Sequence, residues 1–452
     1  MRSYPIAEEF FNSNQFEKNT ISVIGCGRIG ILQACLFADA GFKVLCTDID
    51  PFMAVSLSKG KVPFLRNELA PIISKLIDNG KLSITNNLEE AVSRSRSIVI
   101  TAPVSVDERG RADYTLIERT LRRISSHLRR GTLIIISSVL GIGITRSLKE
   151  LIEQVSGMKA GLDFFIAYSP IPFPDEQNLE TIKRQKRLVA ADDKNSLDSA
   201  ISLLEAISKG GLFAIDNLMV AEAAVLFNIV CKHVGAALAE EFSLFCEEAG
   251  LDYSFIRPFI SLSQEYLKPT LPIDDRLVFI LLEEAENLNI KLKVIPASLA
   301  VNNTSLKHFV KLVVDALKKC GKTLRRAKIA ILGGSRTPNS IDTPKPIFDK
   351  LISMLAAKGA KIKVYDPFLS VKVAVNIPNI TVEKSLNKAI EGADCLIILT
   401  GHESLRRLNL DKVKLIAKMP AAIVDLEGII DPHKAEAAGF VYRKLGRGVS
   451  KT

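Results

Sequence analysis

The chain has 452 residues, of which 47% are hydrophobic and 24% are charged, a balance typical of a folded globular protein. Its length exceeds what one ordinary hydrophobic core accommodates, so we expect two or three domains. The net charge of +10 is spread along the chain. No aromatic platform or groove-reading motif accompanies the basic residues, and this pattern disfavours nucleic-acid binding.

The seven cysteines are scattered, without a CxxC pair or a companion histidine cluster. This spacing disfavours a zinc site and a disulfide framework and is typical of a reducing cytoplasm. The longest apolar run, 132–145, contains serines and glycines and is too short to span a bilayer, so we expect a buried strand and its following loop. No signal pattern precedes it. We therefore predict a cytoplasmic protein without a metal site or membrane insertion.

The first part of the chain, from 21 to about 209, alternates short β-branched runs with helical patterns. Such alternation predicts a parallel sheet with crossover helices. The predicted strands are 22–25, 43–48, 97–101, 132–137, 163–168 and 187–190.

A helical pattern follows over 218–288, where 221–250 contains no proline and is dense in apolar residues. It predicts a long buried helix that ends at Gly250. Strand–helix alternation then restarts, with predicted strands at 328–332, 361–365, 395–400, 422–425 and 440–443. The predicted fold class is α/β, with two doubly wound, Rossmann-like domains joined by a central helical segment. The predicted divisions are 1–19, 20–209, 210–321 and 322–452.

A dinucleotide-binding motif follows the first predicted strand, in the order Gly25, Cys26, Gly27, Arg28, Ile29 and Gly30. This is GxGxxG between a strand and a helix. Gly25 permits the tight turn, Gly27 lets the backbone approach a pyrophosphate, and Gly30 allows the helix to pack closely on the strand. Cys26 is expected to be a small filler rather than a redox thiol.

Asp48 ends the second predicted strand, where a carboxylate accepts the hydroxyls of the adenosine ribose and repels a 2′-phosphate. The cofactor predicted for the 20–209 domain is therefore NAD rather than NADP. Its candidate ligands also include Pro103, which follows the strand at 97–101. The alternative is a glycine-rich turn of any α/β domain. A second such turn, Gly333-Gly334-Ser335, could receive a second nucleotide.

Further motifs occur in an order that resembles the UDP-glucose/GDP-mannose dehydrogenase family, most closely its N-acetylmannosamine-type branch, from about 20 to 448. They include a D-x-x-G-x-x-D loop at 107–113, Ser137-Ser138-Val139 at a strand end, Val364-Tyr365-Asp366-Pro367, and Thr400-Gly401-His402.

The resemblance implies an activity, a cofactor and a partner. Members of the family oxidise the C6 hydroxyl of a UDP- or GDP-linked sugar to a carboxylate in two hydride transfers to NAD. A cysteine thiolate holds the aldehyde stage, and a lysine and an asparagine of the central helix steady the oxyanion. The resemblance also implies a homodimer formed through 210–321, a UDP-sugar-binding type of domain at 322–452, and Ser138 near the nicotinamide.

The sequence departs from the family at the catalytic positions. Thr270 stands where the cysteine belongs, Val225 replaces the lysine and Ile229 replaces the asparagine. A threonine hydroxyl is essentially never ionised near neutral pH, so it cannot form the thioester. Ile171 occupies the position of a glutamate.

The candidate catalytic positions that remain are Thr270, Asp274 and Ser138. In the last domain the sugar-nucleotide loop is shortened, and Arg336 and Lys345 are candidates to contact a diphosphate from shifted places.

Three hypotheses follow from these departures. The first is a catalytically lapsed homologue that binds NAD and a nucleotide sugar and acts by binding or by pairing with an active paralogue. The second is a divergent dehydrogenase that performs one two-electron oxidation, and the third is an intact family enzyme whose catalytic residues lie elsewhere. Lys232 or His233 could serve the second if either faced the nicotinamide. A position on the helix surface is the expectation for both.

Overall fold

The computed structural model describes residues 19–48, 69–107, 109–171, 179–260, 267, 276–335, 338–339, 347–369 and 380–448. The chain divides into two compact units. The N-terminal unit comprises Met1–Ile229 and Arg276–Lys291, and the C-terminal unit comprises Val230–Asp275 and Leu292–Thr452. The central helices are thus divided between the two units. The boundaries of a separate domain at 210–321 stay a prediction.

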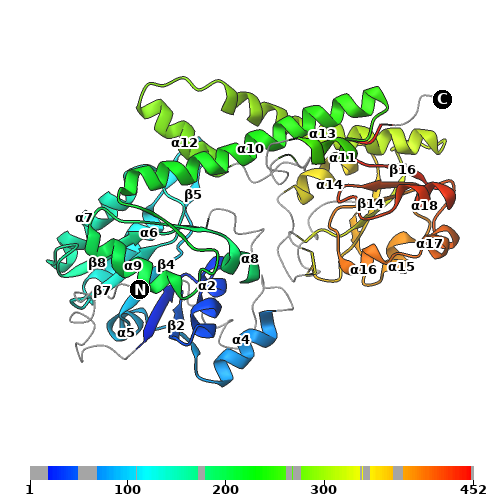
Figure 1. Cartoon of the computed structure of the whole chain (residues 1–452). Helices are drawn as coiled ribbons and strands as arrows, with labels where there is room; N and C mark the ends of the chain where they lie inside the picture. The colour runs from blue at the N-terminus through cyan, green and yellow to red at the C-terminus, as the bar shows by residue number, and fades with distance from the viewer. Residues whose placement is uncertain are drawn as a thin grey trace. The chain divides into compact units, whose positions relative to one another are not determined.

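The N-terminal unit contains an eight-stranded sheet in the order β10-β9-β8-β7-β4-β1-β2-β3 (Figure 1). All neighbouring strands are parallel except β8 and β9. All six strands predicted for this part of the chain are confirmed. The strands are β1 (Thr20–Ile24), β2 (Lys43–Thr47), β3 (Leu82–Thr85), β4 (Ser97–Ile100), β7 (Thr132–Ile136), β8 (Phe164–Tyr168), β9 (Arg187–Ala190) and β10 (Leu212–Ile215), with a separate hairpin of β5 (Ser105–Val106) and β6 (Ala112–Asp113).

Helices flank this sheet, and the central strands β1, β4 and β7 are buried along their whole length. Strands buried on both faces have the continuous apolar runs that made them predictable. The helices of the unit are α2 (Arg28–Asp39), α4 (Leu69–Asp78), α5 (Leu88–Arg94), α6 (Thr115–Ser125), α7 (Ile144–Ser156), α8 (Leu179–Arg184), α9 (Lys194–Glu205) and α12 (Arg276–Asn287).

The C-terminal unit contains a six-stranded, fully parallel sheet in the order β13-β12-β11-β14-β15-β16. The five strands predicted here are confirmed, and β13 is added at one edge. The elements are β11 (Lys328–Leu332), α14 (Phe348–Ala357), β12 (Lys361–Tyr365), β13 (Ile380–Val382), α15 (Leu386–Ile390), β14 (Cys395–Ile398), α16 (Glu403–Arg406), α17 (Leu410–Ile416), β15 (Ala422–Asp425), α18 (Pro432–Ala437) and β16 (Val441–Arg443).

The central segment contains the long helix α10 (Leu218–Ala249), then α11 (Tyr253–Ile256), the 3₁₀ turn η2 (Arg257–Phe259) and α13 (Val294–Lys319). The predicted end of α10 at Gly250 is confirmed. Gly250 has a φ of +73°, and the N–H of Leu251 donates to the carbonyl of Cys246. This left-handed turn satisfies a carbonyl that the helix leaves unpaired.

By length and composition alone, α10 could cross a membrane, although half of its most apolar window is buried within the protein. The helix also places ionisable side chains against protein groups. Glu222, Lys232, His233 and Glu240 are each 7% exposed or less. An apolar helix with buried, hydrogen-bonded carboxylates fits the core helix of a globular protein.

The expectation that Lys232 and His233 lie on the helix surface is wrong. They are 7% and 3% exposed. Asn302 of α13 donates to the carbonyl oxygen of His233 at 3.0 Å and lies 3.0 Å from its Nε2. A helix that is apolar all round is buried on most of its faces, so polar side chains within it are buried too.

One buried ionic cluster joins α13 to α10 within the C-terminal unit. The imidazole of His308 contacts Glu240 through Nδ1 at 2.6 Å and Glu247 through Nε2 at 2.8 Å. Burial lowers the pKa of His308, but the hydrogen bonds to the two carboxylates raise it by more, so the pKa is about 9. Glu247 also accepts the N–H of Gly446 at 2.7 Å, so the cluster holds the turn after β16.

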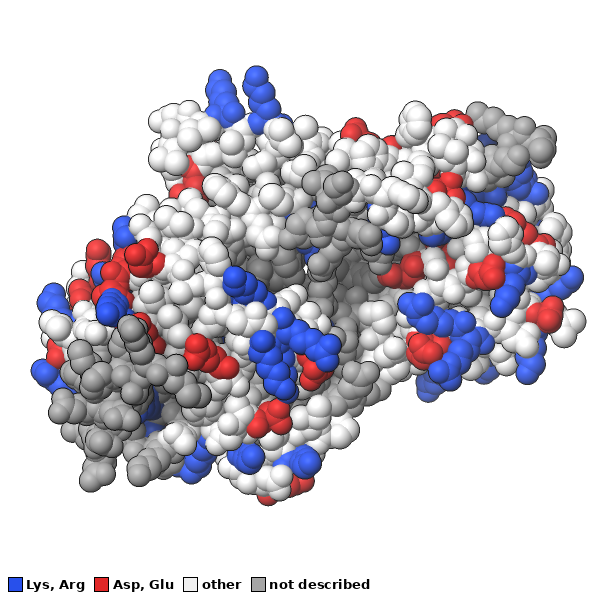
Figure 2. Space-filling model, in the orientation of Figure 1, with Lys and Arg blue, Asp and Glu red and all other residues white. Residues whose placement is uncertain are grey.

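Both signs of charge occur on the face of the molecule drawn in Figure 2, where lysines and arginines form small groups with acidic residues among them. This interspersed distribution is unlike the continuous basic stripe that tracks a nucleic-acid backbone.

The His308 cluster predicts a pH-dependent stability. Because the folded-state pKa exceeds the unfolded value, the protonated imidazole stabilises the fold fully below about pH 6.5, and this contribution disappears as pH rises through about 9. We expect the free energy of unfolding to fall by about 2 kcal/mol between pH 7 and pH 9.5.

Denaturant unfolding of the wild type and of His308→Gln at both pH values tests this prediction. A neutral glutamine removes the titration, so the variant should be less stable at pH 7 and should lose much less stability at pH 9.5. Equal pH dependence of the two proteins would contradict the prediction.

Candidate functional site

The glycine-rich turn between β1 and α2 has the geometry of a dinucleotide-binding turn. Gly25 has a φ of +105°, which favours glycine. A Cβ on Gly30 would lie 1.8 Å from the carbonyl oxygen of Gly25, whereas a Cβ on Gly27 would meet no atom within 4 Å. The turn thus needs two glycines for its own packing and leaves the third facing open space. A pyrophosphate needs such close access to the backbone.

Asp48, after β2, accepts a hydrogen bond from the backbone N–H of Cys26 within this turn. The carboxylate is therefore at the turn and remains partly exposed, as a ribose ligand must be. Cys26 and Cys46 are fully buried, with their sulfurs 3.2 Å apart. The hydrogen bond with the Cys26 thiol, together with burial, raises the pKa of Cys46 well above its usual value. This packing suits the prediction that Cys26 fills space.

The strand order reverses between β1 and β4, because β2 and β3 follow on one side of β1 and β4 and β7 lie on its other side. Such a reversal leaves a crevice for a ligand at the carboxyl ends of β1 and β4. Thr101, after β4, donates to the carbonyl of Gly25 at 2.8 Å. Ser138, after β7, is 7% exposed and donates to the carbonyl of Ala102 at 2.6 Å. The adjacent Pro103 is exposed. The structure therefore gathers Pro103 and Ser138 near the same edge as the turn.

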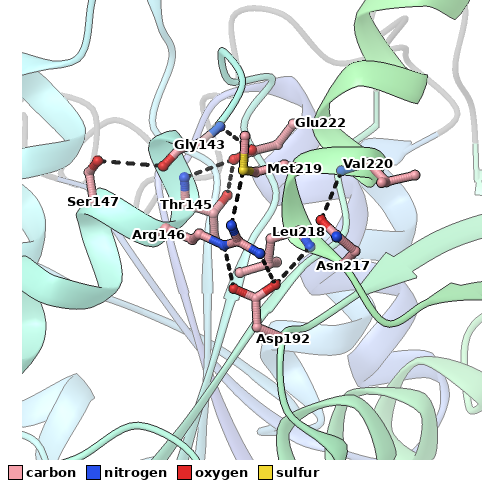
Figure 3. Close-up of polar contacts among 10 residues, drawn as sticks. All are labelled: Gly143, Thr145, Arg146, Ser147, Asp192, Asn217, Leu218, Met219, Val220 and Glu222. Atoms are coloured by element: carbon pink, nitrogen blue, oxygen red, sulfur yellow. Dashed lines mark hydrogen bonds and ion pairs between the residues drawn. The ribbon is translucent and has the colours of Figure 1, made fainter.

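Glu222 of α10 holds the start of α7 (Figure 3). Its carboxylate is fully buried and accepts the N–H of Gly143 at 2.6 Å, the N–H of Thr145 at 2.8 Å and the hydroxyl of Thr145 at 2.6 Å. Burial raises the pKa of Glu222, while these donors act in the opposite direction. An acid at a helix N-terminus is stabilised by the unpaired amides there.

A second contact fixes the same helix junction. Arg146 of α7 forms a bidentate pair with Asp192 at 2.6 and 3.0 Å, and Asp192 also accepts the N–H of Leu218 at the start of α10 (Figure 3). The glutamate and the ion pair together set where α10 begins relative to the end of β7. The sequence did not predict a role for Glu222 or for the Arg146–Asp192 pair. A glutamate within an otherwise apolar helix was nevertheless a signal that Glu222 has a structural role.

The loop after β7 is also held by α12. Glu284 accepts the N–H of Ile142 at 3.2 Å, and the hydroxyl of Tyr114 accepts the N–H of Gly141 at 3.0 Å. Burial raises the pKa of Tyr114 to about 12 and raises the pKa of Glu284. Both groups are therefore kept protonated to higher pH than usual beside the strand end that carries Ser138. Sequence reasoning missed both residues.

A buried arginine lies at the carboxyl edge of the sheet. Because β9 is antiparallel to β8, its first residue, Arg187, lies beyond the end of β8. The guanidinium donates to Ser169 at 2.8 Å and to Gln33 of α2 at 2.7 Å, and burial lowers its pKa to about 10. Its Nη1 has no hydrogen-bond partner among the described residues. The positive charge is met by neutral acceptors in the described part of the chain.

The second glycine-rich turn follows β11 in the C-terminal unit. It lies beside the point where the strand order of that sheet reverses, between β11 and β14. Gly333 has a φ of +82°, and a Cβ on Gly334 would lie 2.6 Å from the ring of Phe348. Asp366, after β12, accepts the N–H groups of Gly334 and Ser335, each at 2.7 Å. This edge is where the fold places a ligand.

The catalytic positions that the family resemblance assigns are only partly described. Val225 and Ile229 are buried on α10, with 5% and 6% exposure, and Asn228 is half-buried. Ile171 is 8% exposed. Thr270, Asp274, Arg336 and Lys345 lie outside the described residues, so their assignments stay predictions. Among the described residues no group of three or more His, Cys, Asp or Glu side chains could hold a metal ion.

Comparison with protein families identifies both nucleotide-type domains. Residues 19–208 match the NAD binding domain of the UDP-glucose/GDP-mannose dehydrogenase family, and residues 330–432 match the UDP binding domain of the same family. The chain belongs to the UDP-glucose/GDP-mannose dehydrogenase family. Its cofactor is NAD, and the geometry of the turn at Gly25, Gly27 and Gly30 fits that cofactor.

Curated relatives match along nearly the whole chain. The UDP-N-acetyl-D-mannosamine dehydrogenase of Pyrococcus horikoshii is 24% identical over 438 residues, which cover 95% of this chain and 99% of that protein. The UDP-glucose 6-dehydrogenase TuaD of Bacillus subtilis is 26% identical over 443 residues, covering 94% and 93%. The first is consistent with the branch that the motifs indicated.

Solved structures share the fold. The structure of the UDP-D-ManNAc dehydrogenase from P. horikoshii superposes with a TM-score of 0.79 at 23% identity, covering 95% of this chain and 99% of that one. A UDP-glucose dehydrogenase from Pyrobaculum islandicum gives 0.80 at 20% identity, covering 96% and 99%.

Two alanine substitutions separate cofactor contact from turn packing. Gly27→Ala places its methyl group in open space at a φ of −63°, so the thermal midpoint should change little while NAD affinity falls about tenfold. The methyl group of Gly30→Ala would collide with the carbonyl of Gly25, so this variant should have a lower thermal midpoint and a lower NAD affinity. Calorimetric NAD titration and thermal melts of each variant provide the measurements. Wild-type NAD affinity in Gly27→Ala would contradict the predicted approach of the pyrophosphate.

Proposed function

We propose that this protein binds NAD and a UDP-linked sugar but does not oxidise the sugar to a carboxylic acid. NAD, when bound, supplies the hydride acceptor of the family's chemistry. What this chain's own residues offer beside it differs from the family pattern. We therefore propose that the protein binds the same ligands as the family but does not catalyse its four-electron oxidation.

The observation that carries the proposal is the burial of aliphatic side chains at the positions assigned to the family's lysine and asparagine. Val225 and Ile229 are 5% and 6% exposed. Neither offers a charge or a hydrogen-bond donor to an oxyanion, and losing one such donor typically costs about 3 kcal/mol of transition-state stabilisation. The predicted replacement of the cysteine by Thr270 removes the nucleophile that would hold the aldehyde.

A second candidate function is a single two-electron oxidation of a nucleotide-linked alcohol. The observation that favours it is the burial of Lys232, an amine on the helix that carries the family's catalytic positions, whereas His233 is engaged by Asn302 of α13. Lys232 lies two helical turns from Val225 on nearly the same face of α10.

The stoichiometry of NADH formation distinguishes these functions. With NAD and a panel of UDP- and GDP-sugars, the purified protein should bind NAD and form no acid. Release of one NADH with an aldehyde or ketone would support the divergent dehydrogenase. Formation of two NADH per sugar would overturn the proposal.

We further propose a homodimer formed through α10. A set of exposed and partly exposed positions on α10 has a heptad-like spacing of four and three residues and is mostly apolar: Val220, Ala224, Phe227, Cys231, Val234, Leu238, Glu241 and Phe245. Val220, Phe227 and Phe245 are 53%, 54% and 69% exposed. An apolar seam with this spacing is what a second copy of the same helix would cover.

A charge placed within this seam should separate the dimer. We expect Phe227→Asp to run as a monomer in size-exclusion chromatography with light scattering, because the carboxylate would be desolvated in the interface. Leu415→Asp, at an 87% exposed position of α17, is the matched control and should leave the oligomeric state unchanged. A dimeric Phe227→Asp variant would place the contact elsewhere.

We also propose that the protein acts in the cytoplasm, without membrane insertion or nucleic-acid binding, in the supply of precursors for polysaccharide synthesis. The scattered free thiols and the interspersed surface charges support this location and these exclusions. The precursor role rests on the family alone.

A further inference from the structure

The two glycine-rich turns are held by the same pair of contacts. In the N-terminal unit, Asp48 accepts an N–H of the turn and Thr101 donates to the carbonyl of Gly25. In the C-terminal unit, Asp366 accepts two N–H groups of the turn, and the hydroxyl of Thr400 donates to the carbonyl of Ser335 at 2.8 Å. An acid after the second strand and a threonine after the fourth strand thus fix each turn.

The C-terminal unit adds a histidine to this arrangement. Nε2 of His402 lies 3.1 Å from Oδ2 of Asp366, and Nδ1 accepts the N–H of Asn339 at 3.0 Å. The imidazole is fully buried and packs against the ring of Phe368, with centroids 5.1 Å apart. Because Nδ1 accepts a hydrogen bond, Nε2 is the nitrogen that carries the hydrogen, and it donates a hydrogen bond to Asp366, with the Ser335 hydroxyl 3.3 Å away.

This histidine changes what Asp366 can do. Oδ2 accepts from Gly334, Ser335 and His402, and Oδ1 accepts the N–H of Phe368 at 2.7 Å. The carboxylate side chain is 0% exposed. A carboxylate with both oxygens so engaged and no access to solvent cannot accept ribose hydroxyls, in contrast to the partly exposed Asp48. The second turn must therefore hold its ligand in another way.

His402 also connects the turn to Asn339, four residues after Ser335. Asn339 donates its N–H to His402, and its side-chain oxygen accepts the N–H of Glu403 at 2.9 Å. Asn339 has a φ of +55°, which asparagine tolerates better than most residues. The segment that starts α16 is thereby joined at two points to Asn339 and at one point to the Asp366 carboxylate.

We propose that His402 is a positioning residue for nucleotide-sugar binding: through Asp366 and Asn339 it fixes the Gly333–Ser335 turn at the ligand-binding edge of the C-terminal sheet. The inference rests on the proposed function, since it assumes that this edge receives the UDP moiety. It assigns to His402 no contact with the ligand. The aspartate, the histidine and the asparagine act as one connected support of the turn.

Calorimetric titration of the full-length protein with UDP and, separately, with NAD tests the proposal. His402→Phe keeps the ring volume and removes the polar contacts of the imidazole with Asp366, Asn339 and the Ser335 hydroxyl. It should weaken UDP binding about tenfold and leave the NAD affinity within about twofold. His402→Gln carries a donor and an acceptor and should recover most of the UDP affinity, a rescue that a role in filling space would not show.

The matched control is Tyr442→Phe, in the same sheet. It removes a buried hydrogen bond to Asp425 of 3.2 Å without touching the turn, so it should lower the thermal midpoint and leave UDP affinity unchanged. If His402→Phe loses its fold, as judged by lost NAD binding, Asn339→Gly decides the question. Glycine adopts the same φ and keeps the N–H, and it should still weaken UDP binding several-fold.

Wild-type UDP affinity in both His402→Phe and Asn339→Gly would overturn the proposal, as would equal weakening in Tyr442→Phe. Absence of UDP binding by the wild type would overturn both this proposal and the proposed function. The two failures are therefore distinguishable.

Discussion

The close approach of α2 to β1 is the constraint on which the N-terminal unit depends. A side chain at Gly30 would overlap the carbonyl of Gly25, so the helix can lie against the strand only where no Cβ is present. This contact aims the first amides of α2 at the carboxyl edge of the sheet, where Asp48 and Thr101 hold the turn. That turn lies beside the point where the strand order of the sheet reverses, between β1 and β4. The NAD site thus follows from backbone packing before any side chain contacts a ligand.

The start of α10 depends on a different interaction, the buried carboxylate of Glu222 at the first turn of α7. Here the energetic balance is between desolvation of an acid and its bonds to unpaired amides. Burial raises the pKa of Glu222, against the effect of these hydrogen bonds. Because the same helix carries Val225 and Ile229 one turn and two turns further along, this carboxylate also fixes where those aliphatic side chains lie. The proposed loss of four-electron chemistry and the architecture of the helix are therefore linked through one residue.

Much of the fold could be predicted because its central strands are continuous apolar runs between helical patterns. Besides the two-residue strands β5 and β6, the missed strands are β3, β10 and β13, which are short, lie at sheet edges and are partly exposed, so no such run marks them. The glycine turn could be predicted because its chemistry is local. The contacts of Glu222, Tyr114 and Arg187 could not, since each joins residues far apart in the sequence. Lys232 and His233 were placed wrongly because their polarity was given more weight than the apolar helix around them.

One consequence concerns the cysteines, of which six are buried and Cys231 alone is exposed. A bulky thiol reagent would therefore reach a single position in an isolated chain, in the middle of α10, and the proposed second copy would cover it. The rate at which that reagent modifies Cys231 therefore reports directly on whether the helix face that we assign to the second copy is covered. The wild-type chain thus already carries a site-specific probe position, and no background cysteine has to be removed to use it.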